Sequence, residues 1–258
     1  MVLGYKPRPA TQKKMFKVKI LTLLPEIFPG VLGHSIIGDA LEKGLWQLEI
    51  IDIRKYGIGK RKAVDDYVFG GGAGMLIRPD VLGEAIENNI SKETKLFYTS
   101  PKGVVFNQKK SAQISKFKEI VIICGRFEGI DQRVIDEYDI EEISIGDYVL
   151  SGGELAAMVI LDSVLRNLDG VLGDANSLKE ESFGDGQGSQ FDNLLEYPHY
   201  TKPQIWKGRE VPEILLSGHH QKIKEWRMQK AQEITKERKG WLGFDFVQQS
   251  TINRNFFL

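Results

Sequence analysis

The feature that most constrains the fold of this 258-residue chain is a repeated alternation of short apolar runs with helical segments. The apolar runs have the length and β-branched content of buried strands, and they lie at residues 17–24, 48–53, 95–99, 119–124 and 142–145. Segments with helical spacing lie at residues 36–43, 78–89, 107–117, 132–138 and 153–168. The last of these is apolar on most of its circumference, which predicts a deeply buried helix. This alternation predicts an α/β protein with a parallel sheet.

Composition divides the chain into four predicted segments. Residues 1–14 lack the apolar core of a signal peptide, and we expect a flexible basic extension there. The α/β domain should occupy residues 15–170, and the Gly/Ser/Asp/Gln-rich residues 171–193 should form a flexible linker or lid. From Pro212 the pattern is helical and basic, and residues 194–258 are predicted to form a small α-helical C-terminal domain.

Charge is unevenly distributed, although 35 basic side chains balance 35 acidic ones. Residues 1–130 carry 21 Lys and Arg against 13 Asp and Glu, residues 131–196 carry 3 against 16, and residues 197–258 carry 11 against 6. Basic flanks around an acidic middle suit a polyanionic partner such as nucleic acid. Ordinary solvated surface charge accounts for the same pattern.

Several functional classes are disfavoured by what the sequence lacks. A single cysteine, Cys124, allows no internal disulfide and fits a reducing cytoplasm. No apolar run reaches the about 20 residues of a membrane helix, so we expect a cytoplasmic protein without a membrane partner. The sequence has no Walker A motif and no dinucleotide fingerprint. Its four histidines lack zinc-like partners, so no metal site is predicted.

Two glycine-rich loops follow neighbouring predicted strands, CGRFEGID at residues 124–131 and SIGDYVLSGGE at residues 144–154. With residues 98–103 they should converge at the carboxyl edge of the sheet and form one pocket. Such a crevice offers backbone donors and acceptors with aromatic lining, including Phe127 and Tyr148. The later loops contain no lysine, which favours a neutral or zwitterionic adenosine-type ligand over a triphosphate. Tight turns that serve only the fold are the alternative.

Ten motifs, in this order, resemble those of the bacterial tRNA (guanine-N1)-methyltransferases that modify guanosine 37, a family of the SPOUT superfamily. The motifs are LLPEIFPG, VDDYVFGGGAGM, YTSPKG, CGRFEGID, SIGDYVLSGGE, the helix that ends in Arg166, GVLG, EESF, EYPHYTKP and VPEILLSGHH. The resemblance extends from Met15 to about Leu242. It implies methyl transfer from S-adenosyl-L-methionine to N1 of guanosine 37 in tRNA, by a homodimer whose active site lies at the subunit interface, and tRNA binding by the C-terminal domain at residues 194–258. It also implies a deep trefoil knot around residues 98–153, although knots are rare.

The resemblance further implies which residues hold the methyl donor. The expected cofactor site comprises Tyr98, Ser100, Pro101, Gly125, Glu128, Ile145, Gly146, Asp147, Tyr148, Val149, Leu150, Gly152 and Gly153. A requirement for Mg²⁺ is possible in this family but is not readable from the residues.

Methylation of guanine N1 removes a proton while negative charge gathers on O6, so a carboxylate base and a neighbouring cation are a sensible pair. By the resemblance, the cation is Arg166 and the base is Glu181, at a position where the family commonly has Asp. Glutamate keeps the carboxylate but adds one methylene, so the backbone must aim it differently. The same resemblance makes Glu196 a substrate-side carboxylate that assists the base. Candidate tRNA phosphate contacts, for which plain surface charge is the alternative, are Arg54, Arg61, Lys62, Arg227, Lys230 and Arg238.

Two rival functions are compatible with these residues. The first is a ribose 2′-O-methyltransferase of the same superfamily, whose chemistry has little use for the linker carboxylate. The second is a non-catalytic RNA-binding module that keeps the fold, which would bind tRNA but not S-adenosyl-L-methionine. The intact glycine loops argue against the second.

Overall fold

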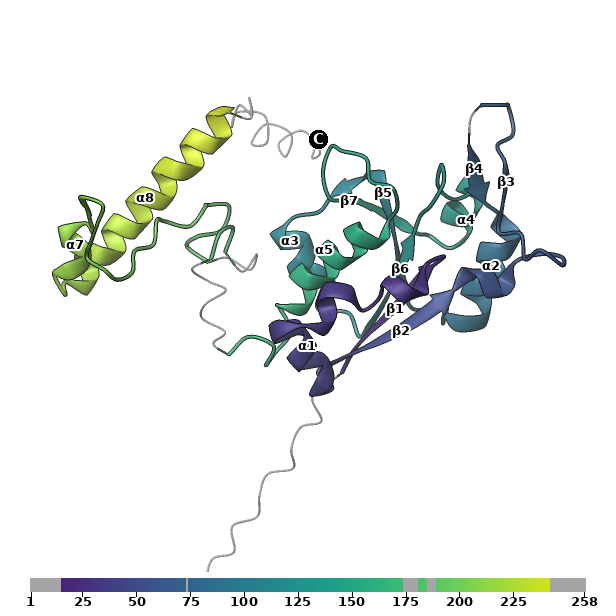
Figure 1. Ribbon diagram of the computed structural model, residues 1–258, viewed down its shortest axis with the longest axis horizontal. Coiled ribbons are helices and arrows are strands. Elements are labelled where there is room, and N and C mark those ends of the chain that lie inside the picture. Colours follow the sequence, from purple (N-terminus) through teal and green to yellow (C-terminus); the bar gives the residue numbers. More distant parts are fainter. Residues whose placement is uncertain (1–14, 73, 174–180, 185–188, 242–258) are drawn as a thin grey trace, which may run out of the picture. The chain divides into compact units, whose positions relative to one another are not determined.

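The computed structural model describes residues 15–72, 74–173, 181–184 and 189–241. The chain divides into two compact units, Met1–Gly173 and Asp174–Leu258. Within the described ranges, Figure 1 shows a sheet with helices in the first unit and a long helix in the second. The predicted extension at residues 1–14 lies outside the described residues, as do residues 174–180 and 185–188 of the predicted linker.

The first unit is built on a five-stranded sheet with strand order β2-β1-β6-β5-β7. Every neighbouring pair in this sheet is parallel, as the alternation of strands and helices predicts. The strands are β1 Phe16–Thr22, β2 Trp46–Asp52, β5 Lys95–Val105, β6 Glu119–Cys124 and β7 Glu141–Ser144. The predicted α/β class with a parallel sheet is therefore confirmed.

Helices cover both faces of the sheet, so consecutive residues of the central strand β6 enter different cores. Ile120 and Ile122 pack with residues of α1 and α5, whereas Val121 and Ile123 pack with residues of α2 and α4 (Figure 1). The helices are α1 Ser35–Glu42, α2 Pro79–Asn89, α3 Gln108–Ile114, α4 Gln132–Glu137 and α5 Glu154–Leu165. Short 3-10 helices lie at Pro25–Ile27, Gly30–Gly33 and Ile53–Tyr56.

Strand β5 is longer than its apolar pattern predicts, because it continues through Pro101 to Val105. Its pairing with β7 shifts so that Thr99 and Val104 both lie opposite Ile143. The four residues between them form a bulge, which is where a strand tolerates proline. The bulge carries Ser100 and Pro101, two of the residues expected to hold the cofactor.

Two further expectations differ from the structure. Residues 54–76, where the sequence pattern predicts neither a strand nor a helix, contain an antiparallel hairpin of β3 Asp65–Tyr67 and β4 Met75–Ile77. Helix α5 is not buried on all sides, because Leu155 and Val159, one turn apart, are each more than half exposed. Apolar content alone could not show this exposed stripe.

The described residues of the second unit include a two-stranded hairpin and two helices. These elements are β8 Ile205–Trp206, β9 Arg209–Glu210, α7 Glu213–Leu216 and α8 His220–Trp241. Its core centres on Phe191, Tyr197 and Ala231. Backbone pairing of Phe183 N–H with the Leu194 carbonyl, at 2.6 Å, joins two of its segments. The limits of the predicted linker and C-terminal domain stay predictions.

Candidate active site

A cavity of about 300 Å³ lies at the carboxyl edge of the sheet in the first unit. Its walls are the β5 bulge, the loop that follows β6 and the loop that follows β7. Twelve of the thirteen residues expected to hold the methyl donor line it, and Asp147 does not. The three loops that the sequence predicts to converge therefore form one pocket.

Close approach of neighbouring atoms, backbone atoms at Gly153 and the Tyr98 ring at Gly125, explains two of the glycines in this pocket. The Gly153 N–H donates to the Gly125 carbonyl at 2.9 Å, which seats the start of α5 on the end of β6. A Cβ atom at Gly153 would lie 2.8 Å from the Gly125 nitrogen and 3.0 Å from the Cα atom of Cys124. A Cβ atom at Gly125 would lie 2.7 Å from the hydroxyl oxygen of Tyr98. Only glycine fits either position without movement of the backbone or the ring.

Tyr98 is a buried residue of the pocket wall. Burial raises the pKa of its phenol to about 12, and the neighbouring Glu142 carboxylate contributes to the rise. The hydroxyl therefore stays protonated at neutral pH. Tyr98 can offer a ring face and a hydrogen bond, but it is a poor general base.

An ion pair that the sequence analysis does not predict joins the two glycine-rich loops, and its carboxylate, that of Glu154, is buried. Glu154, at the first position of α5, accepts from Thr22 Oγ1 at 2.8 Å and from Arg126 Nε at 3.2 Å. Arg126 Nη2 lies 3.0 Å from Glu154 Oε2, and Arg126 Nη1 donates to the Ser151 carbonyl at 3.2 Å. One carboxylate thus ties β1, the 125–131 loop and the helix start together. The sequence pattern that could predict this pair is the opposite charge of two loop residues, the Arg of CGRFEGID and the Glu of SIGDYVLSGGE.

Cys124 is completely buried beside this ion pair. Burial raises the pKa of its thiol well above the ordinary value, and the charge of Glu154 adds to the rise. The thiol is therefore neutral at physiological pH and serves as a small core residue.

Arg166 is the C-cap residue of α5 and is partly buried. The next residue, Asn167, fastens this helix end to α3, because its Nδ2 donates to Ser111 Oγ at 2.9 Å and to the Ser163 carbonyl at 2.8 Å. Ser163 Oγ donates to the same Ser111 oxygen at 2.9 Å. The backbone that carries Arg166 is thereby fixed.

The expected base and its helper lie together in the second unit. Glu181 is partly buried and precedes Ser182, whose Oγ accepts from the Glu196 N–H at 3.0 Å. The Glu196 carboxylate lies 2.8 Å from His199 Nε2. Glu181 and Arg166 belong to different units.

The candidate tRNA contacts fall into two groups. Arg54, Arg61 and Lys62 are exposed, and Lys62 Nζ donates to the Lys55 carbonyl at 3.3 Å, next to Arg54. Arg227 is instead partly buried in the second unit, with its guanidinium 4.8 Å from the centre of the Tyr197 ring. Because Arg227 packs on the Tyr197 ring, its side chain stabilises the second unit as well as carrying a positive charge.

The described residues offer neither a membrane-spanning helix nor a cluster of metal ligands. None of the helices in those ranges is long and apolar enough to cross a membrane. Among the same residues, no group of three or more His, Cys, Asp or Glu side chains is placed to hold a metal ion.

A parallel α/β unit with a glycine-walled pocket at its carboxyl edge defines a ligand-binding class of protein. The family model of tRNA (guanine-1)-methyltransferase TrmD matches residues 16–243, and the chain belongs to this family. Similar proteins include the tRNA (guanine-N(1)-)-methyltransferases of Ehrlichia ruminantium (strain Gardel) and Rhodospirillum rubrum. The first is 52% identical over 227 residues, which are 87% of this chain and 94% of that protein. The second is 50% identical over 232 residues, 90% of this chain and 94% of that protein.

Proposed function

We propose that the protein transfers a methyl group from S-adenosyl-L-methionine to N1 of guanosine 37 in tRNA. The observation that carries this proposal is the glycine-walled pocket, formed by the motif loops of a chain that belongs to the tRNA (guanine-1)-methyltransferase family. The names of its relatives specify the tRNA substrate and the guanine N1 position. We place the reaction in the cytoplasm, where tRNA and a reduced Cys124 are both expected.

The residues of the pocket fit the methyl donor. Gly125, Gly146, Gly152 and Gly153 expose backbone groups along its wall, and Ile145, Val149 and Leu150 supply apolar surface for an adenine ring. Glu128 and Glu142, which also line the cavity, are suitable neighbours for a positive sulfonium. When bound, the donor supplies an electrophilic methyl group, whose bond to the sulfonium sulfur breaks on transfer and leaves the neutral thioether S-adenosyl-L-homocysteine.

Proton transfer and charge stabilisation fall to two side chains of the protein. The Glu181 carboxylate takes the N1 proton as the N1–methyl bond forms, and the Arg166 guanidinium stabilises negative charge on O6. Asn167 supports this assignment because it fixes the helix end that carries Arg166. Ser182 supports it as well, because it links the Glu181 segment to Glu196.

The finer architecture completes the proposal. We infer a homodimer in which the pocket of one subunit meets the linker and C-terminal unit of its partner. The exposed Leu155 and Val159 on α5 support this, because a second copy would cover them.

We also infer a trefoil knot around residues 98–153, supported by the position of β6 between β1 and β5 and by the Gly153–Gly125 contact. Arg54, Arg61, Lys62 and Arg227 are the proposed tRNA contacts of the chain.

The test is methyl transfer to unmodified tRNA that carries guanosine at positions 36 and 37, with the product nucleoside identified by mass spectrometry. We expect 1-methylguanosine. A 2′-O-methylated product would establish the ribose methyltransferase, and tRNA binding without transfer would establish the non-catalytic module.

The residue roles are tested separately. Glu181→Gln should lower turnover at least about 100-fold with little change in the affinity for S-adenosyl-L-methionine, and Glu181→Asp should retain activity. Gly146→Val should prevent cofactor binding in calorimetry. Normal turnover by Glu181→Gln would mean that the base is Glu180 or Asp185 instead. Normal cofactor affinity of Gly146→Val would mean that the cofactor binds elsewhere.

A further inference from the structure

The β3–β4 hairpin exposes two large aromatic side chains. Tyr67 is 82% exposed and Phe69 is 95% exposed, at the end of β3 and just beyond it. The two strands pair in antiparallel register, with Asp65 opposite Ile77 and Tyr67 opposite Met75. We call β3, β4 and residues 68–72 the aromatic arm. A first unit with two extensive apolar cores could have buried these rings, so their exposure requires an explanation.

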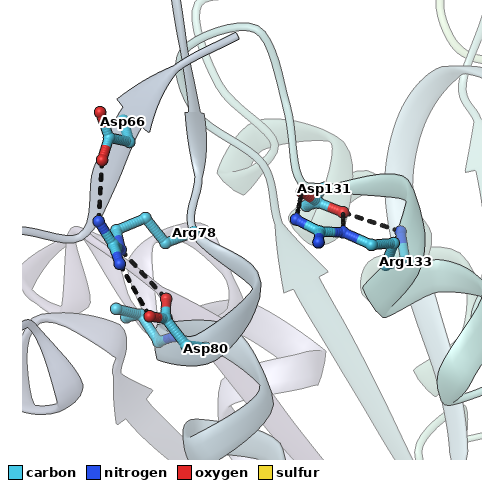
Figure 2. Close-up of polar contacts among 6 residues, drawn as sticks. Asp66, Arg78, Asp80, Asp131 and Arg133 are labelled. Atoms are coloured by element: carbon cyan, nitrogen blue, oxygen red, sulfur yellow. Dashed lines mark hydrogen bonds and ion pairs between the residues drawn. The ribbon is translucent and has the colours of Figure 1, made fainter. Parts of the chain in front are cut away.

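The root of the aromatic arm is held firmly, as Figure 2 shows. Arg78, directly after β4, forms a two-pronged contact with Asp80 at 2.8 and 3.1 Å. Its Nη1 also donates to Asp66 Oδ2 on β3 at 2.8 Å, and its backbone N–H donates to the Val64 carbonyl at 2.9 Å. Both strands are thereby fastened to the start of α2, so the exposed rings lie on an ordered support.

The same root forms part of the pocket wall. The Glu128 N–H donates to the Met75 carbonyl at 2.9 Å, and the Ile77 N–H donates to the Gly129 carbonyl at 3.0 Å. Glu128 and Gly129 both line the cavity. The aromatic arm therefore starts at the proposed methyl-transfer site, and a ligand on the rings would lie beside a substrate entering the pocket.

The segment before the arm is strongly basic. Five exposed cations lie between residues 54 and 62, and they are Arg54, Lys55, Lys60, Arg61 and Lys62. Two acidic side chains near this segment have other partners: Asp52 accepts from the Arg54 N–H at 2.9 Å, and Asp66 is paired with Arg78. Exposed rings next to clustered, exposed positive charge match a single-stranded polyanion whose bases can stack, and RNA loops have that chemistry.

We propose that the aromatic arm stacks Tyr67 and Phe69 against an unpaired nucleobase of the tRNA, next to the target guanine, while the basic segment binds the adjoining phosphates. This proposal rests on the proposed function, since it assigns one surface for the same substrate. The proposed stacking contact differs from the phosphate contacts, because its contribution to tRNA affinity depends on an aromatic ring and not on charge.

The experiment compares tRNA binding by Phe69→Leu, Tyr67→Leu and the double variant with binding by Phe69→Trp, which keeps an aromatic face. Each leucine change should weaken tRNA affinity about 10-fold, and Phe69→Trp should bind like the unaltered protein. Affinity for S-adenosyl-L-methionine should not change in any of them. The salt dependence of tRNA binding should also stay the same, whereas Arg61→Ala should lower its slope by about one.

Three outcomes would overturn the proposal. One is unchanged tRNA affinity in the double variant while the unaltered protein methylates tRNA, a result that leaves the proposed function intact. Another is an equal loss in Phe69→Leu and Phe69→Trp, which would indicate a structural role. A third is a loss that follows a change in oligomeric mass by light scattering, which would assign the rings to contact with a second copy. Failure of the unaltered protein to methylate tRNA would instead reject the proposed function.

Discussion

The pocket and the aromatic arm are both rich in glycine, but they use it for opposite purposes. In the pocket, a Cβ atom at Gly125 or Gly153 would come within 3 Å of neighbouring atoms. At Gly70, Gly71 and Gly72 of the arm nothing lies within 4 Å of the same position, and all three have positive φ angles of 82° to 121°. The first group allows a neighbouring backbone or ring to pack closely, and the second allows a turn in open space.

This difference separates two kinds of functional surface. The pocket glycines let the start of α5 meet the end of β6 and let the Tyr98 ring of β5 pack against them, so the binding surface is fixed by the core beneath it. The arm glycines leave the space around two aromatic rings open, so that surface can receive a large partner. A small ligand suits the first, and a polymer suits the second.

The sharpest test of this comparison exchanges glycine for alanine in both regions. Gly153→Ala places a methyl group against the backbone of Gly125 and Cys124, so we expect S-adenosyl-L-methionine binding to fall below detection and stability to drop by about 1–3 kcal/mol. Gly71→Ala has free space and meets only the backbone preference against positive φ, which costs about 1–2 kcal/mol and lies away from the pocket, so cofactor affinity should not change. Calorimetry of cofactor binding and urea unfolding measure both effects. Equal cofactor affinity in the two variants would refute the distinction.

The sequence could predict the fold where local pattern and final structure agree. Strand β6 was predicted with its correct limits because all but the first residue of EIVIIC are apolar and both faces of the strand are buried. Strand β5 was predicted to end at Thr99, because Pro101 and Gly103 interrupt the pattern and only the pairing with β7 carries the strand past them. The arm was missed because strands of three residues are too short to show a period.

The site divides in a similar way. The pocket residues are readable because long motifs supply them in order, although the exclusion of Asp147 from the lining depends on the turn that the backbone makes. The Glu154–Arg126 pair was missed because a charged residue at a helix start is usually exposed, and only the packing of α5 on β6 buries it. Roles for Arg166 and Glu181 came from resemblance and remain predictions.

A second prediction concerns the ion pair beneath the pocket. Glu154→Gln removes the negative charge that faces Arg126 and should destabilise the protein by about 2 kcal/mol, less than the loss expected for a fully buried pair because the Arg126 side chain is 24% exposed. Cofactor affinity should also weaken, because Arg126 links Glu154 to the Ser151 carbonyl. Urea unfolding and calorimetry measure the two effects, and Glu84→Gln on the exposed face of α2 is the matched control. Equal stability of the two variants would mean that the pair does not fasten the loops.

The smallest expected effect is a pH dependence at the roots of the two regions, where Figure 2 shows an Arg–Asp contact in each. The Arg78 guanidinium holds the pKa of Asp80 below its ordinary value of 3.8, and Arg133 does the same for Asp131 after the pocket loop. A carboxylate whose folded pKa is depressed contributes stability above its unfolded pKa and loses it as pH falls through the folded value. Asp80→Asn should therefore lower stability at pH 7 and reduce the further loss between about pH 4 and pH 2, as measured by urea unfolding across that range. Asp131 caps the start of α4, directly after the pocket loop. Asp131→Asn should therefore have the same effect on stability and should also weaken cofactor binding. If both variants lose as much stability on acidification as the unaltered protein does, neither Arg–Asp contact contributes to stability. The root of the aromatic arm would then be held by other interactions.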